Sequence, residues 1–118
     1  MDDEFTNDSW RQVIAMYDSL VDPQWQYIRR FRDLIAAIGR SAEATGLTAV
    51  TSHETLMISP YTRYPDWFEG RHLRLHPMSD GTVRVHKFPG QFDRHPAETW
   101  TVSLAEAEDF VRKRLADL

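Results

Sequence analysis

Two stretches near the start of the chain repeat hydrophobic residues three or four positions apart, which is the spacing of one helix face. Asn7, Asp8 and Ser9 precede the first stretch and are typical N-cap residues. Asp22-Pro23 restarts the pattern as a cap followed by proline at the first helical position, and Thr45-Gly46 supplies a C-terminal stop. The pattern predicts a helical hairpin with two apolar stripes: Trp10, Val13, Ile14, Tyr17, Leu20 and Val21 in the first helix, and Trp25, Ile28, Phe31, Leu34, Ile35, Ile38 and Ala42 in the second.

After residue 46 the hydrophobic residues gather in short, β-branched runs, which indicate strands. Residues 47–51 and 55–59 predict two strands joined by a turn, and the uniformly apolar Leu56-Met57-Ile58 favours a strand covered on both faces. Residues 98–102 predict the last strand. Ser103 with Glu106 predicts a capping box that opens a closing helix. The apolar stripe of that helix is Leu104, Ala107, Val111, Leu115 and Leu118.

Residues 71–88 carry the clearest period-two alternation in the chain and predict a β-hairpin that turns at Ser79-Asp80-Gly81. A two-residue turn at Asp80-Gly81 would oppose the apolar set of one strand to the polar set of the other. A three-residue loop with Gly81 in the left-handed position of a bulge avoids this, because it pairs Met78 with Thr82. Its register also pairs Leu75 with Val85, His76 with Arg84, and Arg74 with His86.

These elements predict one α+β domain over residues 1–118, with an N-terminal helical hairpin, an antiparallel meander of about five short strands and a C-terminal helix. The chain has 118 residues, of which 42% are hydrophobic, enough for a single core. We expect residues 1–8 to form a flexible, acidic tail.

Composition narrows the classes of function. The net charge of −4 and the isoelectric point of 5.7 argue against broad binding to nucleic acid. The absence of cysteine excludes disulfides, thiolate metal sites and a cysteine nucleophile. The acidic N-terminus does not resemble a signal peptide, and no apolar run approaches the roughly 18 residues of a membrane span. We therefore expect a soluble, cytoplasmic protein that does not bind membranes.

The predicted hairpin places five basic or titratable side chains on one sheet face, which we call the Arg/His face: His72, Arg74, His76, Arg84 and His86. A shared metal ion is disfavoured, because four residues of strand separate His72 from His76 by about 13 Å. A second interpretation is an anion or acid–base site, since neighbouring arginines would keep a histidine neutral. A third is a solvated face paired with acidic residues such as Asp66, Asp93 or Glu98.

Residues 60–70, which we call the aromatic segment, hold four aromatic residues and two prolines. Tyrosine and tryptophan supply large contact areas, so a partner-binding loop is one interpretation. In the other, Trp67 and Phe68 fold back over the end of the core, and Tyr61, Arg63 and Tyr64 are the more exposed members. The candidate binding residues are therefore Tyr61, Arg63, Tyr64, Trp67, His72, Arg74, His76, Arg84 and His86.

Three functions are compatible with this pattern. The first is a small binding or regulatory protein whose partner is another protein, a profile it shares, by class-level analogy, with bacterial toxin immunity proteins. The second is a small-anion binder or an enzyme that uses the Arg/His face under the aromatic segment. The third is a homo-oligomer whose partner is a copy of itself. The sequence designates no catalytic residue, metal ligand or cofactor.

Overall fold

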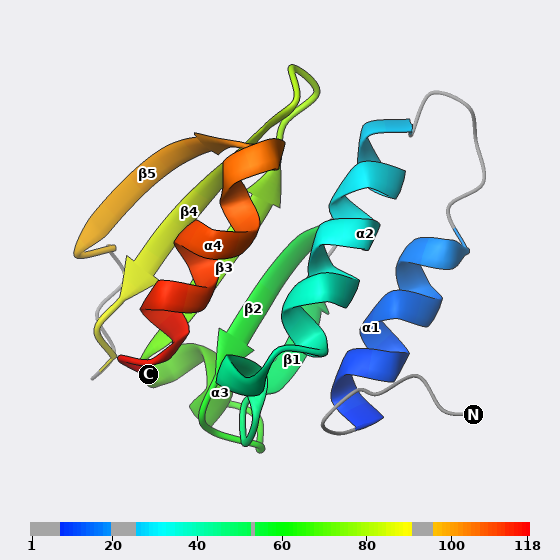
Figure 1. Cartoon of the computed structure of the whole chain (residues 1–118). Helices are drawn as coiled ribbons and strands as arrows, with labels where there is room; N and C mark the ends of the chain where they lie inside the picture. Colours follow the sequence, from blue (N-terminus) through cyan, green and yellow to red (C-terminus); the bar gives the residue numbers. More distant parts are fainter. Residues whose placement is uncertain (1–7, 20–25, 53, 91–95) are drawn as a thin grey trace.

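The computed structural model describes residues 8–19, 26–52, 54–90 and 96–118, and it confirms the predicted α+β fold. Three helices lie over one face of a five-stranded sheet (Figure 1). The elements, in chain order, are α1 (Asp8–Asp18), α2 (Gln26–Gly39), the 3-10 turn η2 (Ala42–Ala44), β1 (Thr48–Ser52), β2 (Thr55–Ser59), the short α3 (Asp66–Glu69), β3 (His72–Pro77), β4 (Thr82–Phe88), β5 (Glu98–Ser103) and α4 (Leu104–Leu115).

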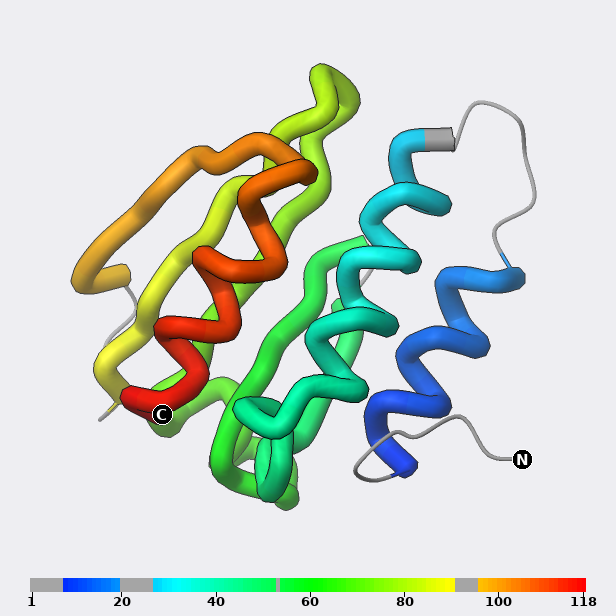
Figure 2. The backbone as a smooth tube through the Cα atoms, in the orientation of Figure 1, coloured from blue at the N-terminus to red at the C-terminus, as the bar shows by residue number. Residues whose placement is uncertain are grey.

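The sheet is an antiparallel meander in which each strand pairs with the next along the chain, in the order β1-β2-β3-β4-β5 (Figure 2). Alternate residues of its inner strands face the helices and are fully buried. Burial of each such side chain contributes about 1.5–3 kcal/mol, so this layer supplies most of the stability. Its members from the strands are Leu56, Ile58, Leu73, Leu75, Val83 and Val85, and those from α2 are Ile28, Phe31, Ile35 and Ile38.

Helix α1 buries the described part of the stripe predicted for it, Trp10, Val13, Ile14 and Tyr17, and two of these side chains hydrogen-bond to the chain next to β1 and β2. Trp10 donates its indole N–H to the Leu47 carbonyl at 3.1 Å, and the Tyr17 hydroxyl donates to the Glu54 carbonyl at 2.9 Å. The predicted Asp22-Pro23 restart, together with Asn7, Leu20, Val21 and Trp25, lies outside the described residues. None of the described helices is long and apolar enough to cross a membrane.

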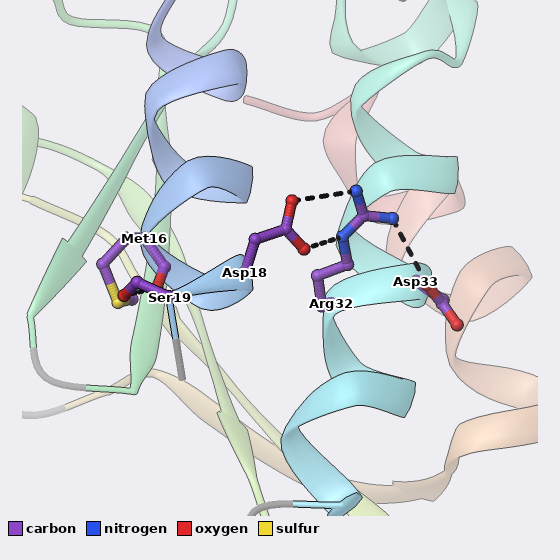
Figure 3. A network of polar contacts seen from close by, with 5 residues as sticks. All are labelled: Met16, Asp18, Ser19, Arg32 and Asp33. Carbon is purple, nitrogen blue, oxygen red and sulfur yellow. Dashed lines mark hydrogen bonds and ion pairs between the residues drawn. The ribbon is translucent and has the colours of Figure 1, made fainter. Parts of the chain in front are cut away.

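A bidentate ion pair joins α1 to α2 (Figure 3). The Arg32 guanidinium points from α2 toward Asp18 of α1, with Nε donating to Oδ1 at 2.8 Å and Nη2 to Oδ2 at 3.3 Å. Its Nη1 donates to Asp33 at 3.3 Å. The hydrogen bonding that Arg32 donates to Asp18 is the main reason that the pKa of Arg32 is raised. Because the Asp18 side chain is more than half exposed, this pair orients the helices more than it stabilises them.

The second helix is shorter than predicted. It ends at Gly39, and the chain continues through η2, so the predicted helical continuation to Thr45 is wrong. The Ser41 hydroxyl donates to the Ile38 carbonyl at 2.6 Å and satisfies an acceptor at the helix end. The tighter turn that follows exposes Ala42 and buries Ala44 instead.

The predicted capping box is also wrong. Ser103 is the N-cap of α4 and the last residue of β5, with the extended backbone usual for a cap, but it makes no side-chain capping hydrogen bond. The first free amide of the helix, that of Leu104, donates to the Gly81 carbonyl at 3.1 Å. The β3–β4 loop therefore takes over part of the capping.

The β3–β4 hairpin has the predicted three-residue loop and register. The Met78 amide donates to the Thr82 carbonyl at 2.9 Å, and Gly81 has a φ of +88°. His76 pairs with Arg84, and Arg74 with His86, so both pairs lie on the sheet face opposite the helices. The candidate functional site is built on that face.

Candidate functional site

A pocket of about 540 Å³ lies between the aromatic segment and the sheet face opposite the helices. Register places its floor: Met57 of β2 pairs with Arg74 of β3, and both belong to the same face as the Arg/His face. The volume is typical of small-molecule sites. The lining residues are Thr51, Ser52, Glu54, Thr55, Met57, Tyr64, Trp67, Phe68, Arg74 and His76.

Three aromatic rings form the apolar wall of the pocket. The ring centroids of Tyr64, Trp67 and Phe68 lie 5.5–5.7 Å from one another, each pair tilted. The short helix α3 sets Trp67 and Phe68 on one turn, with the Glu69 amide donating to the Pro65 carbonyl at 2.9 Å. Beneath the wall Met57 is only 6% exposed. These rings give a ligand a flat apolar surface against which to pack.

Arg74 places a positive charge in this pocket. Its Nε donates to Nε2 of His72 at 2.9 Å, and its Cζ lies 4.3 Å from the centre of the Phe88 ring. Burial lowers the pKa of Arg74, but a guanidinium stays charged at any physiological pH. Among the described residues no carboxylate forms an ion pair with it. The half-buried cation is thus fixed in position by neutral groups.

His72 lies under Arg74 and holds it in place. Its ring is 1% exposed and stacks on Phe88, with the ring centroids 4.7 Å apart and the planes 5° from parallel. Nδ1 lies 2.9 Å from the Gly70 carbonyl, which can only accept, and Nε2 receives the Arg74 hydrogen bond. His72 is therefore neutral and protonated on Nδ1. Burial is the largest cause of its lowered pKa; Arg74 lowers it further, while the bond to Gly70 acts in the opposite direction.

His76 occupies the other polar position of the pocket. Its Nδ1 lies 2.8 Å from the Thr55 hydroxyl, which fixes the ring. Within the part of the chain that the structure describes, its Nε2 has no hydrogen-bond partner. His76 can therefore offer a donor or an acceptor to a bound molecule.

The structure brings together only part of the predicted site. Tyr64, Trp67, Arg74 and His76 line the pocket, whereas His72 is buried behind Arg74. The remaining four predicted residues lie outside the lining: Tyr61, Arg63, Arg84 and His86.

Arg84 and His86 belong to β4, on the side of the sheet that carries β5 and away from the aromatic segment. Arg84 is exposed, and His86 contacts the Thr99 hydroxyl at 2.9 Å through Nδ1. Burial is the first cause of the lowered pKa of His86, followed by the positive charges of Arg84 and Arg74 and by His76.

The aromatic segment is arranged differently from the prediction. Trp67 and Phe68 pack over the outer face of the sheet instead of the end of the core. Arg63 and Tyr64 are exposed as expected, but Tyr61 is half-buried. Its ring occupies the space that a side chain at Gly70 would need, and its hydroxyl accepts a hydrogen bond from Arg71 at 3.0 Å.

The expectation of a solvated, ion-paired face is wrong for His72, which is buried. Of the predicted acidic partners, Asp66 makes no ion pair with a described residue, Glu98 pairs in register with Lys87 on the opposite face, and Asp93 lies outside the described residues. Aromatic rings, instead of carboxylates, cover the part of the face around Arg74 and His76, whereas Arg84 is exposed.

Sequence reasoning missed Phe88 and six of the lining residues, namely Thr51, Ser52, Glu54, Thr55, Met57 and Phe68. Phe88 continues the alternation of Arg84 and His86, so the pattern itself contained that signal. Thr55, Met57 and Phe68 enter because β2 pairs with β3 and the aromatic segment folds over both, which no local pattern reveals.

The arrangement suits the binding of a negatively charged group, with a fixed guanidinium beside an apolar wall. In the described segments no group of three or more histidine, cysteine or acidic residues could hold a metal ion. Comparisons of the chain with protein-family models, with curated proteins and with solved structures find no match. The chemistry of the pocket is therefore the basis for a functional assignment.

Proposed function

We propose that this protein binds a small organic anion in the pocket between the aromatic segment and the sheet. The negative group accepts hydrogen bonds from Arg74, and the apolar body packs against Trp67 and Phe68. One observation carries the proposal: Arg74 is a half-buried cation that lines a pocket and has no carboxylate partner among the described residues.

The charge of Arg74 explains why an anion is the ligand of choice. Its Nε is bonded to His72, while Nη1 and Nη2 make no hydrogen bond to a described residue. These two nitrogens present parallel donors that match a carboxylate or phosphate. A charge-assisted hydrogen bond contributes about 1.5–3 kcal/mol, which corresponds to a tenfold gain in affinity or more.

The first test replaces the guanidinium and leaves the pocket wall intact. We expect 2-naphthoate and 2-naphthyl phosphate to shift the backbone amide signals of Trp67, Phe68 and Arg74 in a two-dimensional NMR titration. In Arg74→Gln the affinity for both should fall at least about tenfold, because the charge is lost while a polar side chain remains. Arg74→Lys should lose part of the affinity, since it keeps the charge without the fork.

Arg84→Gln is the matched control, because Arg84 is an exposed arginine on the same sheet face that does not line the pocket. It should bind both anions as the wild type does. If neither anion shifts the pocket amides at millimolar concentration, or if Arg74→Gln and Arg84→Gln behave alike, the proposal is wrong.

A protein-binding surface, which the sequence also predicts, stays a prediction with weaker support. Tyr64, at 73% exposed, is the large hydrophobic residue that stands out on the described surface. One exposed ring falls far short of the roughly 800 Å² that each partner of a stable interface buries. The pocket, in contrast, joins shape and charge in one place.

A further inference from the structure

We infer that the ligand is a planar aromatic acid with a single negative charge, an aromatic monocarboxylate. This inference rests on the proposed function and narrows it in two respects. The charges that line the pocket determine the charge of the ligand, and the three rings determine its shape.

The lining residues carry almost no net charge. Arg74 contributes one positive charge and Glu54 one negative charge, and His76 in its neutral form contributes none. A monoanion leaves a single negative charge in the pocket, whereas a phosphate monoester, with a charge near −2, would leave about twice that. Because Coulomb energy scales with the charge of the ligand, a dianion doubles both its attraction to Arg74 and its repulsion by Glu54, and these two changes largely offset each other. The cost of removing the ligand from water rises with the square of its charge, so desolvation disfavours the dianion.

The shape of the wall favours a flat ring system over a flexible chain. The Tyr64, Trp67 and Phe68 rings are mutually tilted at 32–60°, so a planar ligand can stack on one ring and meet the edge of another. A rigid aromatic body also loses less rotamer freedom on binding than an alkyl chain does. At about 540 Å³ the pocket has room for a two-ring body.

Four probes of similar size test this inference by isothermal titration calorimetry at pH 8. 2-Naphthoate carries the full set of features, 2-naphthyl phosphate changes the charge, 2-naphthamide removes it, and octanoate keeps the carboxylate on a flexible chain. We expect 2-naphthoate to bind at least about tenfold more tightly than each of the other three.

Glu54→Gln examines the charge argument directly. If it tightens 2-naphthoate binding by some factor, it should tighten 2-naphthyl phosphate binding by about the square of that factor, since the charge is doubled. Glu69→Gln is the matched control, because Glu69 is a glutamate of the aromatic segment that does not line the pocket. It should leave both affinities within twofold of the wild type.

The outcomes separate this inference from the proposed function. If 2-naphthyl phosphate or octanoate binds as tightly as 2-naphthoate, and Arg74→Gln still weakens the binding at least about tenfold, the anion pocket stands and the monocarboxylate inference is wrong. If 2-naphthamide binds as tightly as 2-naphthoate, the anionic character fails and both are wrong. Preference for 2-naphthoate together with the squared response of Glu54→Gln supports both.

Discussion

At the scale of single residues, the His72–Arg74 contact links the protonation of a buried ring to the position of the pocket cation. Neutral His72 accepts the hydrogen bond from Arg74 Nε, but imidazolium would point an N–H at the same donor. Since the Gly70 carbonyl already fixes Nδ1–H, the ring has no alternative tautomer that keeps both bonds. Acidification therefore acts against the fold and against the pocket together.

His72 is predicted to make the protein less stable in mild acid. Its pKa in the folded state is lowered, mainly by burial, below the ordinary value of 6.5 that it regains on unfolding. The unfolded chain then binds the proton first, so stability is complete above about pH 6.5 and is lost as the pH falls toward the folded pKa. The loss cannot exceed about 1.4 kcal/mol per pH unit for one group. Urea unfolding at pH 7.5 and 5.5 measures it.

Two variants isolate this contribution. His72→Gln should lose less stability between pH 7.5 and pH 5.5 than the wild type does. His86→Gln should still show the loss of stability that comes from His72. The window lies above the range where carboxyl groups such as Asp80 and Glu43, whose pKa values are lowered, begin to titrate. If His72→Gln proves too unstable, ¹⁵N NMR of the wild-type ring provides the test: an Nε2–H tautomer at pH 7.5 would contradict the assignment.

At the scale of elements, the β3–β4 loop connects the hairpin to the last helix. Gly81 adopts a φ of +88°, and its carbonyl accepts the Leu104 amide at the start of α4. Asp80 stabilises the same turn, because its Oδ1 accepts the Thr82 amide at 3.0 Å and the Thr82 hydroxyl at 2.6 Å. One short loop therefore fixes both the hairpin register and the position of a helix.

Gly81→Ala is predicted to lower the free energy of unfolding by about 1–2 kcal/mol, because an L-residue with a side chain pays that cost in the left-handed region. A Cβ at this position would meet no atom within 4 Å, so backbone conformation is the cause and crowding is not. Gly81→Asn should lose less, since asparagine tolerates this conformation. Urea unfolding at pH 7.5 measures the difference. Ser79→Ala is the control, because it lies in the same exposed loop and should change the stability little. If Gly81→Ala were as stable as the wild type, the prediction would be wrong.

Periodicity predicted the elements and the hairpin register because both follow from which side chains need burial. Leu73 and Leu75 must face the same side as Val83 and Val85, and a single loop length achieves that. Helix ends were predicted less well, because the end of α2 at Gly39 depends on how the following turn packs. The pocket could not be predicted from the sequence, because the path of the aromatic segment over the sheet depends on tertiary packing.

At the scale of the whole molecule, the two faces of the sheet have different tasks. The helices α1, α2 and α4 cover one face (Figure 1). The aromatic segment covers part of the other face and leaves a pocket there. Stability comes mainly from the helix-covered layer, whereas the proposed binding residues lie in the opposite layer. The sheet separates the two sets of side chains, so changes in one layer should have little effect on the other.

Two substitutions, one in each layer, test this separation. Ile35→Ala in α2, where the side chain is fully buried, is expected to lower the free energy of unfolding by about 2–5 kcal/mol and to leave the affinity of the folded protein for 2-naphthoate within twofold. Met57→Ala removes the floor of the pocket and should weaken 2-naphthoate binding several-fold, because the ligand loses apolar contact. Urea unfolding and calorimetric titration measure the two effects, and Ile35→Val provides a milder change, of about 0.5–1.5 kcal/mol, if the alanine variant unfolds. An equal loss of affinity in the Ile35 and Met57 variants would mean that the helices shape the pocket through the sheet, and the two layers would then act as one unit.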